Sequence, residues 1–225
     1  MNPLAKRAAA GTAGLLIPLM AFIFVSAGTI RFWQGWLFWL SFSVSVIAIT
    51  AYLLNRDPAL VERRMRAGPR AESRPSQKII QALNLVMFVA IMIVSGLDHR
   101  FGSSHLPATI VVIANVLVMA AFGFILLVLR ENTFAASTIT VEAGQRVIST
   151  GPYAHVRHPM YAGAVLLILA MPMALGSLWG LLAAAILPPI LIARIFDEER
   201  TLSAELPGYD DYRRAVPHRL IPLVW

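Results

Sequence analysis

Residues 151–163 read Gly-Pro-Tyr-Ala-His-Val-Arg-His-Pro-Met-Tyr-Ala-Gly, and an apolar run long enough to enter a bilayer follows directly. The stretch holds five side chains that form hydrogen bonds, two prolines and two glycines. Polar groups are costly near hydrocarbon, so a dense cluster beside a membrane segment needs a reason other than packing. This stretch, called the Arg-His-Pro motif below, is therefore the first candidate for a functional site.

The second half of the motif predicts the start of a helix. Pro159 suits the first turn of a helix, and His158 before it is pushed toward an extended conformation. The helix would begin at Pro159 and descend into the membrane. Its free N–H groups and positive dipole end would lie beside Arg157 and His158, an arrangement that favours an anion.

The composition is that of an integral membrane protein. Of 225 residues, 58% are hydrophobic and 14% are charged, whereas a soluble domain carries about 25% charged residues. The chain contains no cysteine, which excludes disulfides, thiolate metal sites and cysteine nucleophiles. We expect one membrane domain over residues 1–225, with membrane spans in 1–129 and a catalytic region in 130–225.

The expected fold is all-α, with four spanning helices followed by an intramembrane helical hairpin and a cytoplasmic tail that binds the cofactor. Four runs meet the ~20-residue requirement for a span, namely residues 8–30, 36–54, 79–97 and 107–129. A fifth apolar region, 161–196, is split by Gly176-Ser177 into two arms. The first arm is only about 22 Å long, so the hairpin is expected to reach partway across. Pro172 and the pair Pro188-Pro189 should kink the arms.

The basic residues favour one orientation. If the N-terminus is cytoplasmic, every Lys and Arg except Arg31 and Arg100 falls on the cytoplasmic side, as the positive-inside rule requires. This places the motif, the mouth of the hairpin and the C-terminal tail together. The net charge of +7 is thereby explained by topology, and no nucleic-acid partner is expected. The basic loop 55–78 is interpreted as a topology determinant that faces anionic lipid.

Three further segments should meet at the same place. The acids Asp197, Glu198 and Glu199 end the second arm, where the helix dipole disfavours them, so they should pair with arginines such as Arg157 or bind a cationic ligand. Arg130 follows the fourth span, where it is either an interface anchor or part of the pocket. The tail 209–222 is either a surface helix on the membrane or a lid over the pocket.

Together these segments resemble the isoprenylcysteine carboxyl methyltransferase family. The resemblance rests on the following elements, in chain order: Gly-x-Tyr-x-x-x-Arg-His-Pro-x-Tyr-x-Gly at 151–163, Glu-Glu-x-x-Leu at 198–202, Tyr-x-x-Tyr at 209–212 and Arg-Leu-Ile-Pro at 219–222. It covers roughly the C-terminal half of the chain. The first two spans match only in being apolar.

The resemblance implies S-adenosylmethionine as methyl donor and a carboxylate on a lipidated cysteine as acceptor, reached from the bilayer. The membrane lipids and a lipophilic or prenylated substrate are then the partners. The implied catalytic residues are Arg130, Arg157 and Glu199, with Arg130 orienting the acceptor carboxylate. The residues implied to bind the cofactor are Gly151, Tyr153, Val156, Arg157, His158, Pro159, Tyr161, Glu198 and Glu199.

Other functions remain open from the sequence. A phospholipid N-methyltransferase would use the same donor, and a sterol-type reductase would use NADPH. A transporter would place polar residues at mid-membrane, where only Asn84 and Asn115 are notable, and both are interpreted as interhelical hydrogen-bonding residues. No metal-binding pattern and no Gly-rich phosphate loop occurs, so no metal is expected.

Overall fold

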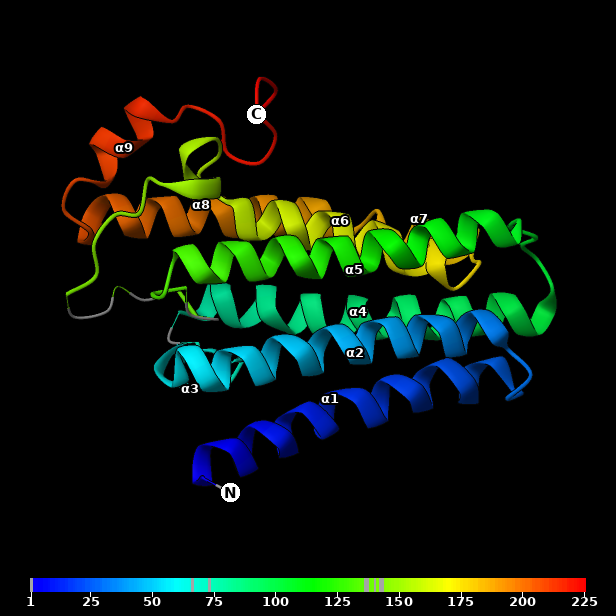
Figure 1. The fold of residues 1–225 in the computed structure, drawn as a ribbon. Coiled ribbons are helices and arrows are strands. Elements are labelled where there is room, and N and C mark those ends of the chain that lie inside the picture. Colours follow the sequence, from blue (N-terminus) through cyan, green and yellow to red (C-terminus); the bar gives the residue numbers. More distant parts are fainter. Residues whose placement is uncertain (1, 66, 73, 136–137, 140, 142–143) are drawn as a thin grey trace.

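The computed structural model describes residues 2–65, 67–72, 74–135, 138–139, 141 and 144–225, and in these residues all regular structure is helical (Figure 1). In chain order the helices are α1 (Pro3–Ala27), α2 (Trp33–Arg56), α3 (Pro58–Met65), α4 (Pro75–Phe101), α5 (Ala108–Glu131), the 3₁₀ turn η1 (Gly151–Ala154), α6 (Pro159–Ala174), α7 (Leu178–Ala184), α8 (Leu187–Glu205) and α9 (Tyr209–Ala215). The long helices run side by side as one bundle (Figure 1). The predicted all-helical fold is therefore confirmed for the described residues.

Five candidate membrane spans lie within the described residues. Four of them, α1, α2, α4 and α5, coincide with the four predicted spans, and the fifth is the run Leu178–Glu205 that contains α7 and α8. Helix α6 has 16 residues, so it is about 24 Å long and shorter than the ~30 Å hydrocarbon core. The second arm of the predicted hairpin is thus long enough to cross, whereas the first is short, as expected.

The second arm differs from the prediction in where its acids lie. Pro188 lies in the first turn of α8, directly after the break between α7 and α8, so the arm is interrupted beside the predicted pair Pro188-Pro189. Helix α8 then continues past the three acids to Glu205. Asp197, Glu198 and Glu199 were expected at a helix end, and that expectation is wrong. On a continuing helix they point in three directions about 100° apart.

The two ends of the bundle have different roles. The end that carries α3, η1 and α9 is called the site end, and the opposite end, with the α1–α2, α4–α5 and α6–α7 connections, is called the far end (Figure 1). At the far end, the buried Asp98 of α4 accepts hydrogen bonds from Ser177 Oγ at 2.5 Å and Ser104 Oγ at 2.6 Å. Ser177 also caps α7 by accepting from the Gly180 amide. These hydrogen bonds hold the α6–α7 turn, and with it the start of α7, against α4.

Helix α1 packs against α4 at a position where only glycine fits. A Cβ at Gly96 would collide with Ser26 Oγ and lie 2.8 Å from the Ile23 carbonyl oxygen. Gly123 on α5 is exposed and has nothing within 4 Å of the same ideal Cβ position. Small residues at such crossings let membrane helices approach closely.

We predict that Gly96→Ala destabilises the protein by about 1–3 kcal/mol because α1 and α4 must separate. The matched variant Gly123→Ala should be neutral or slightly more stable, since alanine favours a helix by about 1 kcal/mol over glycine. Thermal unfolding in detergent measures both. An unfolding midpoint for Gly96→Ala at or above that of Gly123→Ala would contradict the packing described.

Candidate functional site

The Arg-His-Pro motif joins a short turn to a membrane helix. Gly151 opens η1 with φ at +57°, in the left-handed region that glycine adopts without strain, and its Cα faces the side chain of Glu131. His158 precedes the first helical residue, Pro159, so α6 begins where the sequence predicted. Arg157 and His158 are both buried, at 6% and 4% exposure. Two potentially charged side chains in so little water require partners.

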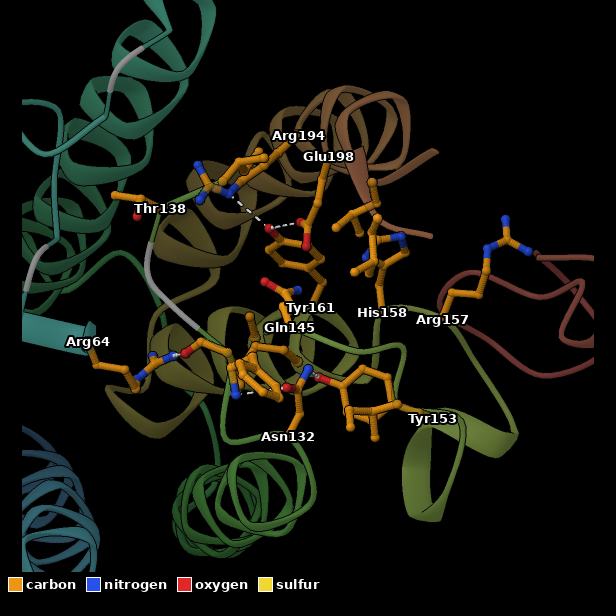
Figure 2. A pocket seen from close by; sticks show the side chains of 18 of the residues that line it. Arg64, Asn132, Thr138, Gln145, Tyr153, Arg157, His158, Tyr161, Arg194 and Glu198 are labelled. Carbon is orange, nitrogen blue, oxygen red and sulfur yellow. Dashed lines mark hydrogen bonds between the residues drawn. The ribbon is translucent and has the colours of Figure 1, made fainter. Parts of the chain in front are cut away.

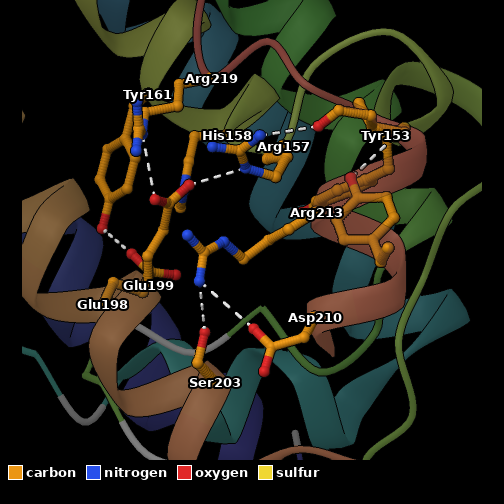
Figure 3. Close-up of polar contacts among 12 residues, drawn as sticks. Tyr153, Arg157, His158, Tyr161, Glu198, Glu199, Ser203, Asp210, Arg213 and Arg219 are labelled. Carbon is orange, nitrogen blue, oxygen red and sulfur yellow. Dashed lines mark hydrogen bonds and ion pairs between the residues drawn. The ribbon is translucent and has the colours of Figure 1, made fainter. Parts of the chain in front are cut away.

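Glu199 supplies those partners (Figure 3). One carboxylate oxygen, Oε1, lies 2.7 Å from Arg157 Nε and 3.3 Å from His158 Nε2, while Oε2 lies 3.0 Å from Arg219 Nε. The Arg157 guanidinium also donates to the Val216 carbonyl oxygen at 2.7 Å. The predicted pairing of the acidic segment with Arg157 across the hairpin mouth is therefore present. We call this cluster, consisting of Glu199, Arg157, His158 and Arg219, the carboxylate clamp.

The C-terminal tail lies directly on the motif. The backbone N–H groups of Arg157 and His158 donate to the carbonyl oxygens of His218 and Arg219, each at 2.9 Å. Arg219 thus reaches Glu199 from a segment that is held by backbone hydrogen bonds as well as by its side chain. Of the two interpretations of the tail, packing over the site agrees with these contacts, whereas a helix lying apart on the membrane does not.

Three tyrosines of the motif and tail form an aromatic wall. Tyr212 Oη donates to the Tyr153 carbonyl oxygen at 2.8 Å, and Tyr153 Oη accepts from Asn132 Nδ2 at 3.1 Å. Burial raises the pKa of Tyr153 to about 12, although the hydrogen bond from Asn132 opposes the rise. Burial, and next the negative charges of Glu199 and Glu198, raise the pKa of Tyr209. These hydroxyls therefore stay protonated near neutral pH and can donate hydrogen bonds.

A second polar network lies deeper, between α4, α6 and α8 (Figure 2). Tyr161 Oη donates to Glu198 Oε2 at 2.6 Å and accepts from Arg194 Nε at 2.9 Å. The same guanidinium donates to Gln77 Oε1 at 2.7 Å and to Glu72 Oε1 at 3.2 Å. Arg194 is thereby fixed by partners on three segments, and it holds the Tyr161 hydroxyl next to Glu198.

Glu72 shows that the basic loop 55–78 does more than mark topology. Its side chain is 1% exposed and pairs with Arg194 inside the bundle. Arg74 of the same loop forms an exposed ion pair with Glu205 of α8, at 3.1 Å. The loop therefore docks on α8 and supplies a buried acid to the site. The excess of arginines around Glu72 gave no sequence signal for this role.

A cavity of about 500 Å³ lies between the motif, the tail and helices α4, α5, α6 and α8. This volume is within the range of about 300–1,000 Å³ that is typical of small-molecule sites. The outer part of the wall is polar and includes Arg157, His158, Tyr161 and Glu198 (Figure 2). The inner part is mainly apolar and is formed by Phe122, Ile125, Ala164 and Leu191. One continuous space therefore joins a charged surface to a membrane-embedded apolar surface.

Two buried polar atoms in the cavity wall lack a hydrogen-bond partner among the described residues. They are Tyr209 Oη in the tail and Asn84 Oδ1 on α4. A buried polar atom without a partner costs about 1–3 kcal/mol, so an orphan atom in a cavity wall indicates where a ligand atom would bind. Asn84 was interpreted as an interhelical hydrogen-bonding residue, but its amide oxygen lines the cavity.

The predicted site residues divide into three groups. Tyr153, Arg157, His158, Tyr161 and Glu198 line the cavity. The described wall does not include Gly151, Val156, Pro159 or Glu199: Gly151 is exposed, Val156 and Pro159 are buried, and Glu199 holds the clamp. Arg130 is exposed, with its guanidinium carbon 5.8 Å from the ring centroid of Tyr52 on α2. It is not among the described residues that line the cavity, whereas Phe122 and Ile125 of the same helix are.

Other lining residues were not predicted to belong to the site. Arg64, Asn84 and Gln145 come from a loop, a span and a connection that the sequence gave no reason to bring together. Asn132 lies in the segment after the fourth span, in which Arg130 was the residue expected at the site. The signal in the sequence is the pair of amides Gln81 and Asn84 within one long apolar run, both of which line the cavity.

We predict that Glu199→Gln loosens the tail, because it leaves the buried Arg157 guanidinium without its carboxylate. Breaking such a buried pair costs about 3–5 kcal/mol. Limited trypsin digestion should cut the variant faster after Arg213, Arg214 and Arg219 than it cuts the wild type. The control is Glu205→Gln, which removes an exposed pair on the same helix. Equal digestion of the two variants would show that the clamp does not hold the tail.

Comparison with known proteins finds a family similarity in the region that contains most of this site. Residues 105–206 match the model of the phospholipid methyltransferase family. This is a family of membrane methyltransferases related to the isoprenylcysteine carboxyl methyltransferases. A search of the curated proteins found no match to the chain. The matched region extends from just before α5 to the residue after α8. It includes the motif, Arg194 and the acids Asp197, Glu198 and Glu199 of α8, and this part of the chain is similar to a membrane methyltransferase.

Proposed function

We propose that this chain is a membrane methyltransferase that transfers a methyl group from S-adenosylmethionine to a lipophilic acceptor. One observation carries the proposal. A single cavity joins a charged, hydrogen-bonding surface to a membrane-embedded apolar surface, and it lies largely within the region that matches a methyltransferase family. A polar donor and an apolar acceptor would have to meet in such a space.

The charged part of the cavity fits S-adenosylmethionine, which combines a carboxylate, an ammonium group, ribose hydroxyls and an adenine ring. When bound, this group supplies a methyl carbon activated by an adjacent sulfonium. Glu198 would bind the ammonium or the ribose hydroxyls, and Arg157 and His158 would lie near the carboxylate. Tyr153 and Tyr212 offer ring surface for the adenine, and the unpartnered Tyr209 hydroxyl offers a hydrogen-bond donor.

The apolar part fits the chain of an amphiphilic acceptor. Phe122 and Ile125 of α5 face Ala164 of α6 and Leu191 of α8 in the cavity wall. An acceptor chain in this space would hold its polar head toward the charged part, where the methyl donor is expected. Holding two reactants in line removes much of the entropic barrier to a bimolecular displacement, and exclusion of water strengthens the effect.

The charges of the wall favour a carboxylate acceptor, as in an isoprenylcysteine-like lipid. Among the described lining residues four are arginines, Arg64, Arg146, Arg157 and Arg194, whereas Glu198 is the one acid. Two of the four already have an acidic partner behind the wall, since Arg157 pairs with Glu199 and Arg194 with Glu72. Guanidinium groups orient a carboxylate through paired hydrogen bonds. A carboxylate is already nucleophilic near neutral pH, so the chain would not have to supply a base.

A phospholipid amine is the second candidate acceptor, because the matching family is named for phospholipid methylation. An amine must lose a proton during methylation, and Glu198 is the acid of the wall that is placed to accept it. The same family match favours methyl transfer over a sterol-type reductase. Thermal stabilisation of the protein by S-adenosylhomocysteine, without stabilisation by NADPH, separates these two classes.

The cofactor assignment predicts different behaviour for two neighbouring acids. Glu198→Gln should weaken the binding of S-adenosylhomocysteine about tenfold or more, because it removes a charge-assisted hydrogen bond in the cavity. Asp197→Asn should bind it like the wild type, since Asp197 points to Ser76 and Gln77 of α4 and does not line the cavity. Isothermal titration of the purified protein measures both. No saturable binding by the wild type would overturn the proposed function itself.

The acceptor assignment predicts a loss of transfer without a loss of cofactor binding. Ala164→Leu should fill the apolar part of the cavity and reduce methyl incorporation into membrane lipids about tenfold or more, while the affinity for S-adenosylhomocysteine stays unchanged. The control Leu166→Phe changes volume on the same helix at a side chain that is 39% exposed and outside the cavity. If Ala164→Leu transferred methyl groups as fast as the control, the acceptor chain would not occupy this space.

A further inference from the structure

The last six residues, called the C-terminal tip, form an entirely apolar segment outside the helices. They are Leu220, Ile221, Pro222, Leu223, Val224 and Trp225. Ile221, Leu223 and Val224 are 56%, 89% and 74% exposed. An apolar patch on a surface segment marks a contact with a protein or a membrane, because in water it would have no favourable partner.

The tip is an ordered turn and not a loose end. The amides of Leu220 and Ile221 donate to the Trp225 carbonyl oxygen at 2.8 Å and 3.1 Å, and the amide of Trp225 returns a bond to the Ile221 carbonyl oxygen at 3.1 Å. Leu223 sits at the turn with φ at +66°, which within the described residues is the one positive φ outside glycine. The backbone is thus held in a conformation that leucine rarely adopts, and it presents the Leu223 side chain outward.

The position of the tip indicates which partner covers it. The chain end turns back from α9 and lies over α6 and α8, whereas α9 lies out at the site end (Figure 1). The Trp225 ring is 6.0 Å from that of Phe196, a half-exposed residue of α8 within the candidate span Leu178–Glu205. The tip therefore continues the lipid-facing surface of a membrane helix. The charged helix α9 precedes the tip, and its Arg213 and Arg214 pair with Asp210 and Asp211 of the same helix.

Arg219 links the tip to the carboxylate clamp. Its guanidinium carbon lies 5.0 Å from the ring centroid of Phe196 and 5.2 Å from that of Trp225, while its Nε contacts Glu199 Oε2 at 3.0 Å (Figure 3). The two rings therefore fix the direction in which Arg219 approaches Glu199. Any force that holds Trp225 against α8 also holds Arg219 in the clamp.

We propose that the C-terminal tip docks into the interfacial layer of the bilayer through Ile221, Leu223 and Val224, and that this docking holds Arg219 on Glu199. The partner is the lipid surface itself. Apolar side chains enter the boundary between headgroups and acyl chains. The clamp beside the cavity is then complete only when the tip is in the membrane. Docking does not depend on the proposed methyl transfer.

Because the chain contains no cysteine, single-site labelling tests the docking directly. The fluorophore NBD is attached to the cysteine of the Leu223→Cys variant. The labelled protein is reconstituted in vesicles of phosphatidylcholine and phosphatidylglycerol. The control is Asp211→Cys on α9, where the side chain is 76% exposed. We expect nitroxide-labelled lipid to quench NBD at position 223 and aqueous iodide to quench it at position 211.

Two results would overturn the docking. One is quenching at position 223 by iodide as strong as at position 211. The other is protection from both quenchers, which would mean that a second copy of the chain covers the tip.

The link to the clamp has its own test in the same vesicles. Leu223→Asp should increase the rate of trypsin cleavage after Arg219 about tenfold, since a charged side chain is expelled from the interface. Leu223→Met keeps an apolar side chain and should be cleaved like the wild type. Equal cleavage of the two variants would show that the clamp does not depend on docking.

Discussion

The carboxylate of Glu199 joins three segments that are far apart in the chain. It lies on α8, while Arg157 and His158 come from the motif before α6 and Arg219 comes from the tail. A carboxylate with 5% of its side chain exposed is unfavourable unless positive partners surround it, and here its two oxygens are shared among three. The hydrogen-bonding needs of one buried acid thus fix the mutual position of α6, α8 and the tail, which form much of the cavity wall.

The cavity lies where the membrane changes from polar to apolar, and this explains its two kinds of surface. Helix α6 is short and begins with a proline, so its N-terminus and the motif lie at one end of the bundle, while Ala164 lies about 8 Å further in. On α8 the polar residues Glu198 and Arg194 lie toward the site end of the bundle. Leu191, about one turn from Arg194, lies toward the interior. The same two helices therefore line both the charged and the apolar part of one space.

Much of this architecture could be predicted from local sequence signals. The four long apolar runs, the helix start at Pro159 and the meeting of the motif with the acids of α8 follow from length, proline chemistry and the return of the hairpin. Five of the nine residues implied to bind the cofactor line the cavity. The rotation of a residue about its helix could not be predicted so well. Arg130 was expected at the site, but its guanidinium lies against Tyr52 of α2 and it does not line the described cavity.

The remaining residues depend on tertiary contacts for which the sequence offers no local signal. Glu72 and Arg64 come from a basic loop whose charges suffice to explain it as a topology signal, and only docking on α8 gives Glu72 its buried partner. Glu199 was expected to contact the cofactor. In the structure it pairs with Arg157 and is not among the residues that line the described cavity. For Glu199, the sequence thus predicted that the residue lies near the site, but it did not predict which groups the carboxylate contacts.

The most direct measurement is the transfer of labelled methyl groups from S-adenosylmethionine by the purified protein in vesicles that contain extracted membrane lipids. We expect label in the lipid phase, released by mild base if the acceptor is a carboxylate and resistant to base if it is an amine. Incorporation that does not exceed that of heat-denatured protein, with any lipid extract tested, would contradict the account of the cavity as a methyl-transfer site.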